Sequence, residues 1–91
     1  MAEISGSQVR ENLRTYILQN FLFSDDQSLL DDTFSFRDTR TIDSMGMVEL
    51  ISFIEEKYHI KVLDEDMVPE KLDSIDRLVE FVRQKQGVHS G

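Results

Sequence analysis

The sequence predicts an all-α fold, a small four-helix bundle made of three main helices and one short helix. Apolar residues recur at helical spacing in three separate stretches, which indicates three amphipathic helices. The one run with strand-like composition, Ile60 to Leu63, is too short to build a sheet alone. A chain of 91 residues fits a single domain over 1–91. We expect an ordered core over about 7–86 and a flexible tail over 88–91.

The first helix is expected to begin near Ser5 to Ser7, where a hydroxyl can accept a hydrogen bond from the free backbone donors of the first turn. Val9, Leu13, Ile17 and Phe21 then recur at four-residue spacing. This stripe predicts an amphipathic helix of about four turns.

The periodicity stops between Phe23 and Asp43, where Asp, Ser and Thr dominate. Connections this long without regular structure are uncommon in compact domains. We expect Phe34 and Phe36 to pin the connection across the core, and Leu29-Leu30 to form a short turn. A long crossover would also let the next helix run roughly parallel to the first.

The second helix is predicted over Ser44 to Tyr58. Its apolar face is formed by residues at helical spacing, namely Met47, Leu50, Ile51, Ile54 and Tyr58. His59 follows at the carboxyl end, where a cation is favourable, so we interpret it as a capping residue and not as a catalytic one.

The last third of the chain predicts one short and one long helix. We expect Asp64 to Met67 to start a one-turn helix before Pro69. Asp73-Ser74 begins the final helix, whose apolar positions are Ile75, Leu78, Val79 and Val82, and Gly87 ends it.

Composition excludes several functions. The chain has no Cys and two His, so it offers no thiol nucleophile, no disulfide and no Ser-His-Asp set, which disfavours these enzyme mechanisms. A net charge of −8 disfavours nucleic acid and favours partners with basic surfaces. No apolar run reaches the length of a membrane span and no signal-peptide pattern is visible at the start, so we expect no membrane insertion and a cytoplasmic location.

A calcium loop is the metal site to test in so acidic a chain. The twelve-residue span from Asp38 to Glu49 has Arg40 and Ile42 where oxygen ligands are needed, and Asp43 where the turn needs Gly. The sequence therefore predicts no metal site.

Asp43-Ser44-Met45-Gly46 lies where the long connection meets the second helix. A helix N-terminus has unpaired N–H groups and a positive dipole end, so a phosphodiester on Ser44 would be well tolerated. Either residue could equally be a simple N-cap. Asp73-Ser74 begins the last helix with the same dipeptide, and there we adopt the capping interpretation, so local spacing leaves both roles open at Ser44.

Asp43 to Leu50, followed by Ile54 to Tyr58, resembles the signature of acyl and peptidyl carrier proteins. The resemblance covers nearly the whole chain and implies a bundle of acyl-carrier type. It implies that Ser44 receives 4′-phosphopantetheine from coenzyme A through a phosphopantetheinyl transferase that needs magnesium. It also implies that Asp43 helps to hold that metal during the transfer.

The same resemblance implies a partner-binding surface on the second helix. Met45 and Val48 should be exposed on it, and the acidic residues Glu49, Glu55 and Glu56 should meet basic residues of partner enzymes. The alternatives are burial of the two apolar residues against the long connection and a plain solvated face for the three Glu.

Two departures bear on the cargo. Met45-Gly46 follows Asp43-Ser44, which looks more like the discrete D-alanyl and aminoacyl carriers, and the stretch from Asp64 to Leu72 is longer than in fatty-acid carriers. The resemblance thus implies a free-standing monomeric carrier of an acyl or aminoacyl thioester, which is not itself an enzyme. It implies that an adenylate-forming ligase loads the carrier and that an acyl transferase or synthase unloads it. The rival interpretation is an unmodified acidic helical adaptor that binds a basic protein and tolerates Ala at position 44.

Overall fold

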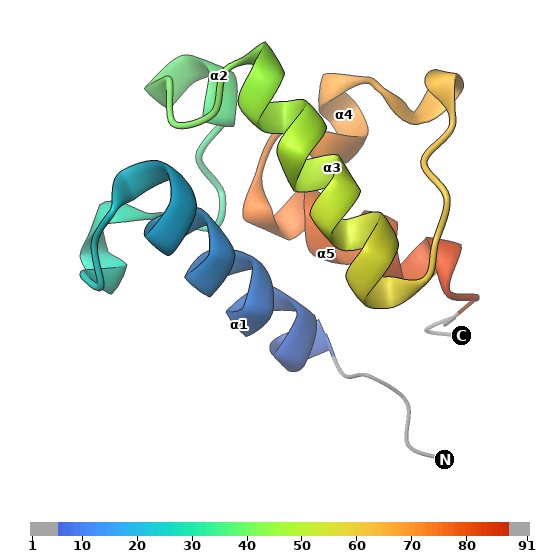
Figure 1. The fold of residues 1–91 in the computed structure, drawn as a ribbon, viewed down its shortest axis with the longest axis horizontal. Helices are drawn as coiled ribbons and strands as arrows, with labels where there is room; N and C mark the ends of the chain where they lie inside the picture. The colour runs from blue at the N-terminus through green and yellow to red at the C-terminus, as the bar shows by residue number, and fades with distance from the viewer. Residues whose placement is uncertain (1–5, 88–91) are drawn as a thin grey trace.

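The computed structural model describes residues 6–87, and within them it contains three long helices, two short helices and no strand (Figure 1). The α-helices are α1 (Gly6–Ile17), α2 (Phe36–Thr39), α3 (Ser44–Tyr58), α4 (Pro69–Leu72) and α5 (Ile75–Lys85). The predicted all-α bundle is confirmed. The expected short helix near Asp64 to Met67 is a 3-10 turn, and two short α-helices that were not predicted, α2 and α4, are present.

The predicted stripe of the first helix divides into an α-helical and a π-helical part. Val9, Leu13 and Ile17 are fully buried along α1, and a π-helical turn, Leu18–Leu22, continues it. Phe21 in this turn is only partly buried. Phe23 ends the segment with a left-handed backbone, φ 51°. The predicted helix start at Ser5 lies outside the described residues.

The connection between α1 and α3 contains a 3-10 turn, Gln27–Leu29, and α2. Phe36 is 1% exposed and secures the connection as expected, whereas Phe34 is 56% exposed, so its predicted place in the core is wrong. Phe36 begins α2, and its backbone N–H donates to the Asp73 carbonyl at 2.8 Å. Phe34 lies in a turn in which its own N–H donates to the Asp31 carbonyl at 3.3 Å, and that turn projects its ring outward.

Asp32 ties this connection to both neighbouring helices. Its carboxylate pairs with Arg14 and, at 3.0 Å, with Arg10, both on α1. Its carbonyl accepts a hydrogen bond at 3.0 Å from the N–H of Asp76, which is in the first turn of α5. A connection without helical periodicity is therefore held by polar contacts to α1 and α5.

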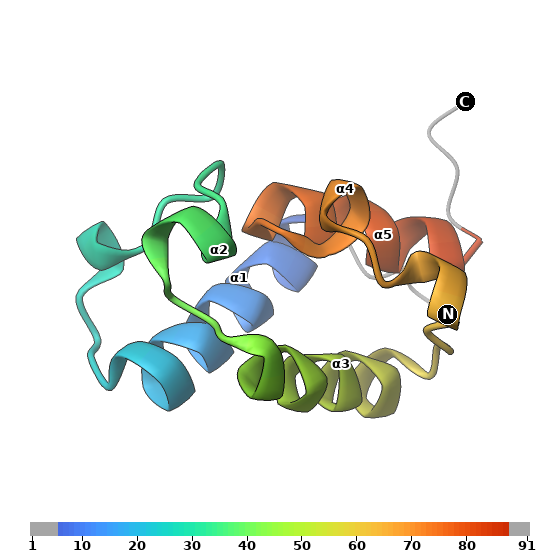
Figure 2. The same ribbon diagram turned by 90° about the horizontal axis from the view of Figure 1, so that it is seen from above.

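Figures 1 and 2 show α1 and α3 running in opposite directions. The expected parallel arrangement is therefore wrong. The chain uses the length of the connection for two short helical turns and returns to the end of the bundle where α1 finishes. Tyr16 of α1 and Phe53 of α3 stack with ring centroids 4.0 Å apart, which joins the two helices directly.

α3 has the predicted bounds, and Leu50, Ile51, Ile54 and Tyr58 are buried on its inner face. His59 is its C-cap residue, with a left-handed φ of 55° and its N–H donating to the carbonyl of Glu55. The capping interpretation of His59 is thus confirmed, although it caps through its backbone.

The segment after α3 has two short turns where one was expected. A 3-10 turn, Asp64–Asp66, precedes Pro69, and Pro69 itself begins α4, which the sequence analysis missed. Proline suits a first helical position because its missing N–H would be unpaired there.

The final helix begins and ends as predicted. Ser74 is its N-cap, and Gly87 has a φ of 77° just beyond its end. The predicted tail over 88–91 lies outside the described residues. No helix within 6–87 is both long and apolar enough to cross a membrane.

Candidate functional site

Asp43 and Ser44 have different tasks at the start of α3. Asp43 is the N-cap residue in an extended conformation, and its Oδ1 accepts a hydrogen bond from the N–H of Gly46 at 2.7 Å. Ser44 is the first helical residue and is exposed. Because Asp43 satisfies the cap, the Ser44 hydroxyl is not needed for it, and it makes no hydrogen bond within residues 6–87.

In the second Asp-Ser dipeptide, Asp73-Ser74, the serine and not the aspartate is the N-cap residue. Ser74 is the N-cap residue of α5, and its Oγ accepts from the N–H of Arg77 at 3.2 Å. Ser74 is 3% exposed and Asp73 is 8% exposed. The two dipeptides are identical in sequence, yet Ser44 is accessible to a reagent and Ser74 is not.

The glycine that follows Ser44-Met45, Gly46, is required by the packing at the start of α3. It is buried, and a Cβ placed there would lie 2.7 Å from Cε1 of Phe21 and 3.1 Å from Oδ1 of Asp43. The missing side chain thus lets the Phe21 ring and the capping carboxylate reach the first turn of α3. A Gly inside a predicted helix was the available signal for this close approach.

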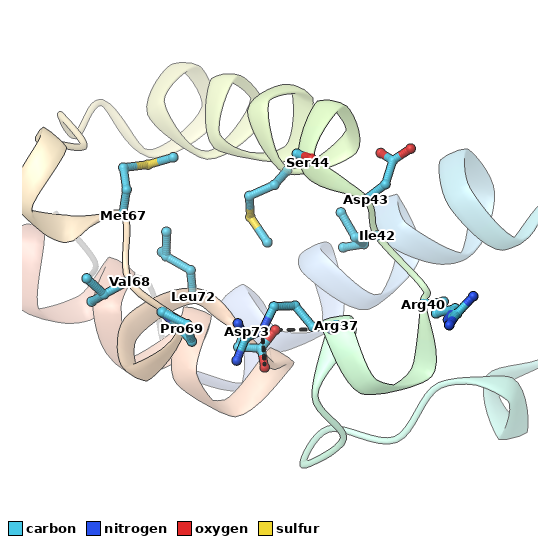
Figure 3. Close-up of a pocket in the computed structure, with 11 residues that line it drawn as sticks. Arg37, Arg40, Ile42, Asp43, Ser44, Met67, Val68, Pro69, Leu72 and Asp73 are labelled. Carbon is cyan, nitrogen blue, oxygen red and sulfur yellow. Dashed lines mark hydrogen bonds and ion pairs between the residues drawn. The ribbon is translucent and has the colours of Figure 1, made fainter.

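A pocket of about 510 Å³ lies beside Ser44, between α2, the start of α3 and α4 (Figure 3). Its wall is mainly apolar with an Arg and Asp pair on the side opposite Ser44. The lining residues are Arg37, Arg40, Ile42, Asp43, Ser44, Met47, Met67, Val68, Pro69, Leu72 and Asp73. Sequence analysis did not identify the pocket, because two segments distant in sequence, 37–47 and 67–73, form it.

The predicted partner-binding residues do not all have the same surroundings. Met45 and Val48 are 77% and 60% exposed, and Glu49 and Glu56 are also exposed. Met45 and Val48 are three residues apart on α3 and hence neighbours on its outer surface.

Glu55 is different. It is partly buried, and its Oε2 accepts a hydrogen bond from the backbone N–H of Val62 at 2.9 Å. Its carboxylate therefore fastens the chain that follows α3, which leaves it less available to a partner than Glu49 or Glu56.

The largest pKa shift concerns a residue that does not line the pocket. The pKa of Asp66 lies well below its usual range because Lys71 and Lys85 donate to its carboxylate, at 2.8 and 2.7 Å, as does the N–H of Leu63. These contacts join the 3-10 turn to α4 and α5, so we assign Asp66 a structural role. No group of three or more His, Asp or Glu residues suited to a metal ion occurs in the described part of the chain.

The fold and the site together define a small helical protein that exposes one serine at the start of its central helix. Comparison with known proteins shows similarity to one family, the acyl carrier proteins. Acyl carrier proteins of Brachyspira hyodysenteriae are 34% identical over 68 residues, covering 75% of this chain and 85% of theirs. The acyl carrier protein of Buchnera aphidicola subsp. Schizaphis graminum is 39% identical over 51 residues, covering 56% of this chain and 62% of its own length.

No family model matches the chain. The similarity to the Brachyspira proteins shows that the chain belongs to the acyl carrier protein family. Its function is that of a carrier, and it is not an enzyme.

Proposed function

We propose that the chain carries an acyl or aminoacyl group as a thioester on a 4′-phosphopantetheine arm attached to Ser44. The observation that supports this most strongly is the placement of Ser44. It is exposed at the first position of α3, relieved of capping by Asp43, and beside the pocket.

The only group that this chain must supply for attachment of the arm is the hydroxyl of Ser44. Its oxygen forms a bond to the phosphorus that bears pantetheine in coenzyme A. The pyrophosphate P–O bond breaks, 3′,5′-ADP leaves, and the hydroxyl proton passes to a base of the transferase. The arm supplies the thiol, which suits a chain without Cys.

The start of α3 favours the product of that reaction. A phosphodiester anion on Ser44 would lie at the positive end of a helix of 15 residues. Oδ1 of Asp43 accepts the capping hydrogen bond. Asp43 is exposed, and its other carboxylate oxygen makes no hydrogen bond within residues 6–87, so that oxygen can contribute to the magnesium site of the transferase.

Three kinds of partner follow from this role: the transferase, an adenylate-forming ligase that loads the arm, and an acyl transferase or synthase that unloads it. We propose that they dock on Met45 and Val48, with basic residues facing Glu49 and Glu56. The carrier acts as a monomer. The cytoplasmic location and the similarity of Asp43-Ser44-Met45-Gly46 to D-alanyl and aminoacyl carriers stay predictions.

Intact-mass measurement after incubation with coenzyme A, magnesium and a broad-specificity phosphopantetheinyl transferase tests the proposal. One phosphopantetheine should be added to the wild type and none to Ser44→Ala. Ser52→Ala, an exposed serine on the same helix, and Ser74→Ala, the buried cap of α5, should both be modified. A folded wild type that two different transferases leave unmodified would favour the unmodified acidic adaptor.

A further inference from the structure

The pocket beside Ser44 has two unlike sides. In Figure 3, Ser44 lies at one edge, and Arg37 and Asp73 lie at the opposite edge. The wall formed by the chain around α4 is apolar, with Met67, Val68 and Leu72. A group that extended from the Ser44 side would therefore contact apolar side chains first and the Arg37–Asp73 pair last.

The Asp73 carboxylate has partners other than the Arg37 guanidinium. Ser35 donates its hydroxyl to Oδ2, and the backbone N–H of Arg37 donates to Oδ1 at 3.2 Å. Asp73 is also 8% exposed. Its charge is thus already stabilised by hydrogen bonds within the protein.

The guanidinium of Arg37, in contrast, has most of its donors free. Its contact with Asp73 is a single ion pair of 3.9 Å from Nε, and its side chain is 70% exposed. A guanidinium has five N–H donors arranged to bind a carboxylate through two parallel hydrogen bonds. Arg37 therefore has free donors at the end of the pocket opposite Ser44, whereas the guanidinium of Arg40, the other arginine of the lining, points away from that end (Figure 3).

We infer that this carrier favours a cargo with an apolar body and a terminal carboxylate, which lies in the pocket with its carboxylate on Arg37. The inference rests on the proposed attachment of the arm to Ser44. It differs from the aminoacyl cargo that the sequence motif suggests, since an ammonium group at this place would face a guanidinium.

The test uses three cargoes of one length. The transferase loads the carrier from coenzyme A thioesters whose acyl groups share a pentamethylene spacer and end in a methyl, a carboxylate or an ammonium group. Intact mass first establishes loading at Ser44, and the thermal unfolding midpoint is then measured at neutral pH and low salt. A group that binds the folded state alone raises this midpoint.

We expect the carboxylate-ended form to unfold about 2 to 6 °C above the methyl-ended form, as for a preference of about two- to fivefold from one partly exposed ion pair. The difference should shrink as salt is added. Arg37→Gln should abolish it. Arg40→Gln is the matched control, because Arg40 also borders the pocket but its guanidinium points away from Arg37 and Asp73 (Figure 3).

A second measurement keeps the test decisive if Arg37→Gln unfolds. The nuclear magnetic resonance signal of the Arg37 Nε–H group in the wild type should move on loading with the carboxylate-ended cargo and stay unchanged with the methyl-ended one. Loaded carriers with equal midpoints, or an ammonium-ended form that is the most stable, would overturn the inference while leaving attachment at Ser44 intact. Failure to load any cargo would instead count against the proposed function.

Discussion

Asp43 caps α3 by accepting a hydrogen bond from the backbone N–H of Gly46 at 2.7 Å. This contact places the cap one residue earlier than in the second Asp-Ser dipeptide of the chain, where Ser74 is itself the cap. Because of that shift, Ser44 is exposed at the first helical position, and its hydroxyl is available for attachment.

Alanine at the serines of the two Asp-Ser sites should therefore have unequal effects on stability. Ser74→Ala removes a cap and should lower the free energy of unfolding by about 1 kcal/mol. Ser44→Ala removes an exposed hydroxyl without a partner and should change it by less than about 0.5 kcal/mol. Urea unfolding of the unmodified proteins measures both. Equal losses at the two sites would mean that Ser44 also acts as a cap.

Gly46→Ala should destabilise the protein although alanine favours helix by about 1 kcal/mol over glycine. The new Cβ would lie 2.7 Å from the ring of Phe21, and such overpacking costs about 1–3 kcal/mol. Chemical unfolding of Gly46→Ala alone and combined with Phe21→Leu measures the clash. In the Phe21→Leu background the same substitution should be neutral or stabilising, and an unchanged loss there would refute this explanation.

Stability should fall in acid through Asp66. Its folded-state pKa lies below the unfolded value, chiefly because of the hydrogen bond from Lys71. The carboxylate therefore stabilises the fold above the unfolded pKa of about 4, and the stabilisation is lost as pH falls through the lowered folded pKa. Urea unfolding from pH 7 downward should show the advantage of wild type over Asp66→Asn shrinking below about pH 4.

Asp64→Asn, in the same turn but exposed, is the control for this series. It should lower the free energy of unfolding by less than about 0.5 kcal/mol at neutral pH, because the Asp64 carboxylate makes no ion pair or hydrogen bond within 6–87. A gap between wild type and Asp66→Asn that stays constant down to acid pH would contradict the assigned role of Asp66.

Met45→Ala and Val48→Ala should weaken docking and leave the fold intact. Both side chains are largely exposed, so we expect urea midpoints close to wild type. The kcat/KM of the transferase for each variant should fall about three- to tenfold through lost apolar contact. Leu29→Ala, which removes an exposed apolar side chain far along the chain from α3, should have wild-type kinetics. Unchanged kinetics for Met45→Ala and Val48→Ala would exclude the proposed docking surface.

The periodic parts of the fold could be read from the sequence because they depend on neighbours in the chain. The bounds of α3, the buried stripe from Val9 to Ile17 and the ends of α5 at Ser74 and Gly87 all follow from spacing and capping. The signature around Ser44 likewise indicated the family that the curated relatives show.

Other features required the tertiary structure because they depend on contacts between distant residues. Phe36 and Phe34 have similar sequence surroundings, yet only Phe36 is anchored by the Asp73 carbonyl and buried. Packing determines which residue of each Asp-Ser dipeptide becomes the cap. Packing also places Arg37 at the pocket beside Ser44. Side-chain periodicity indicates which face of a single helix is buried. The pocket, in contrast, is formed by the segments 37–47 and 67–73, which only folding brings together.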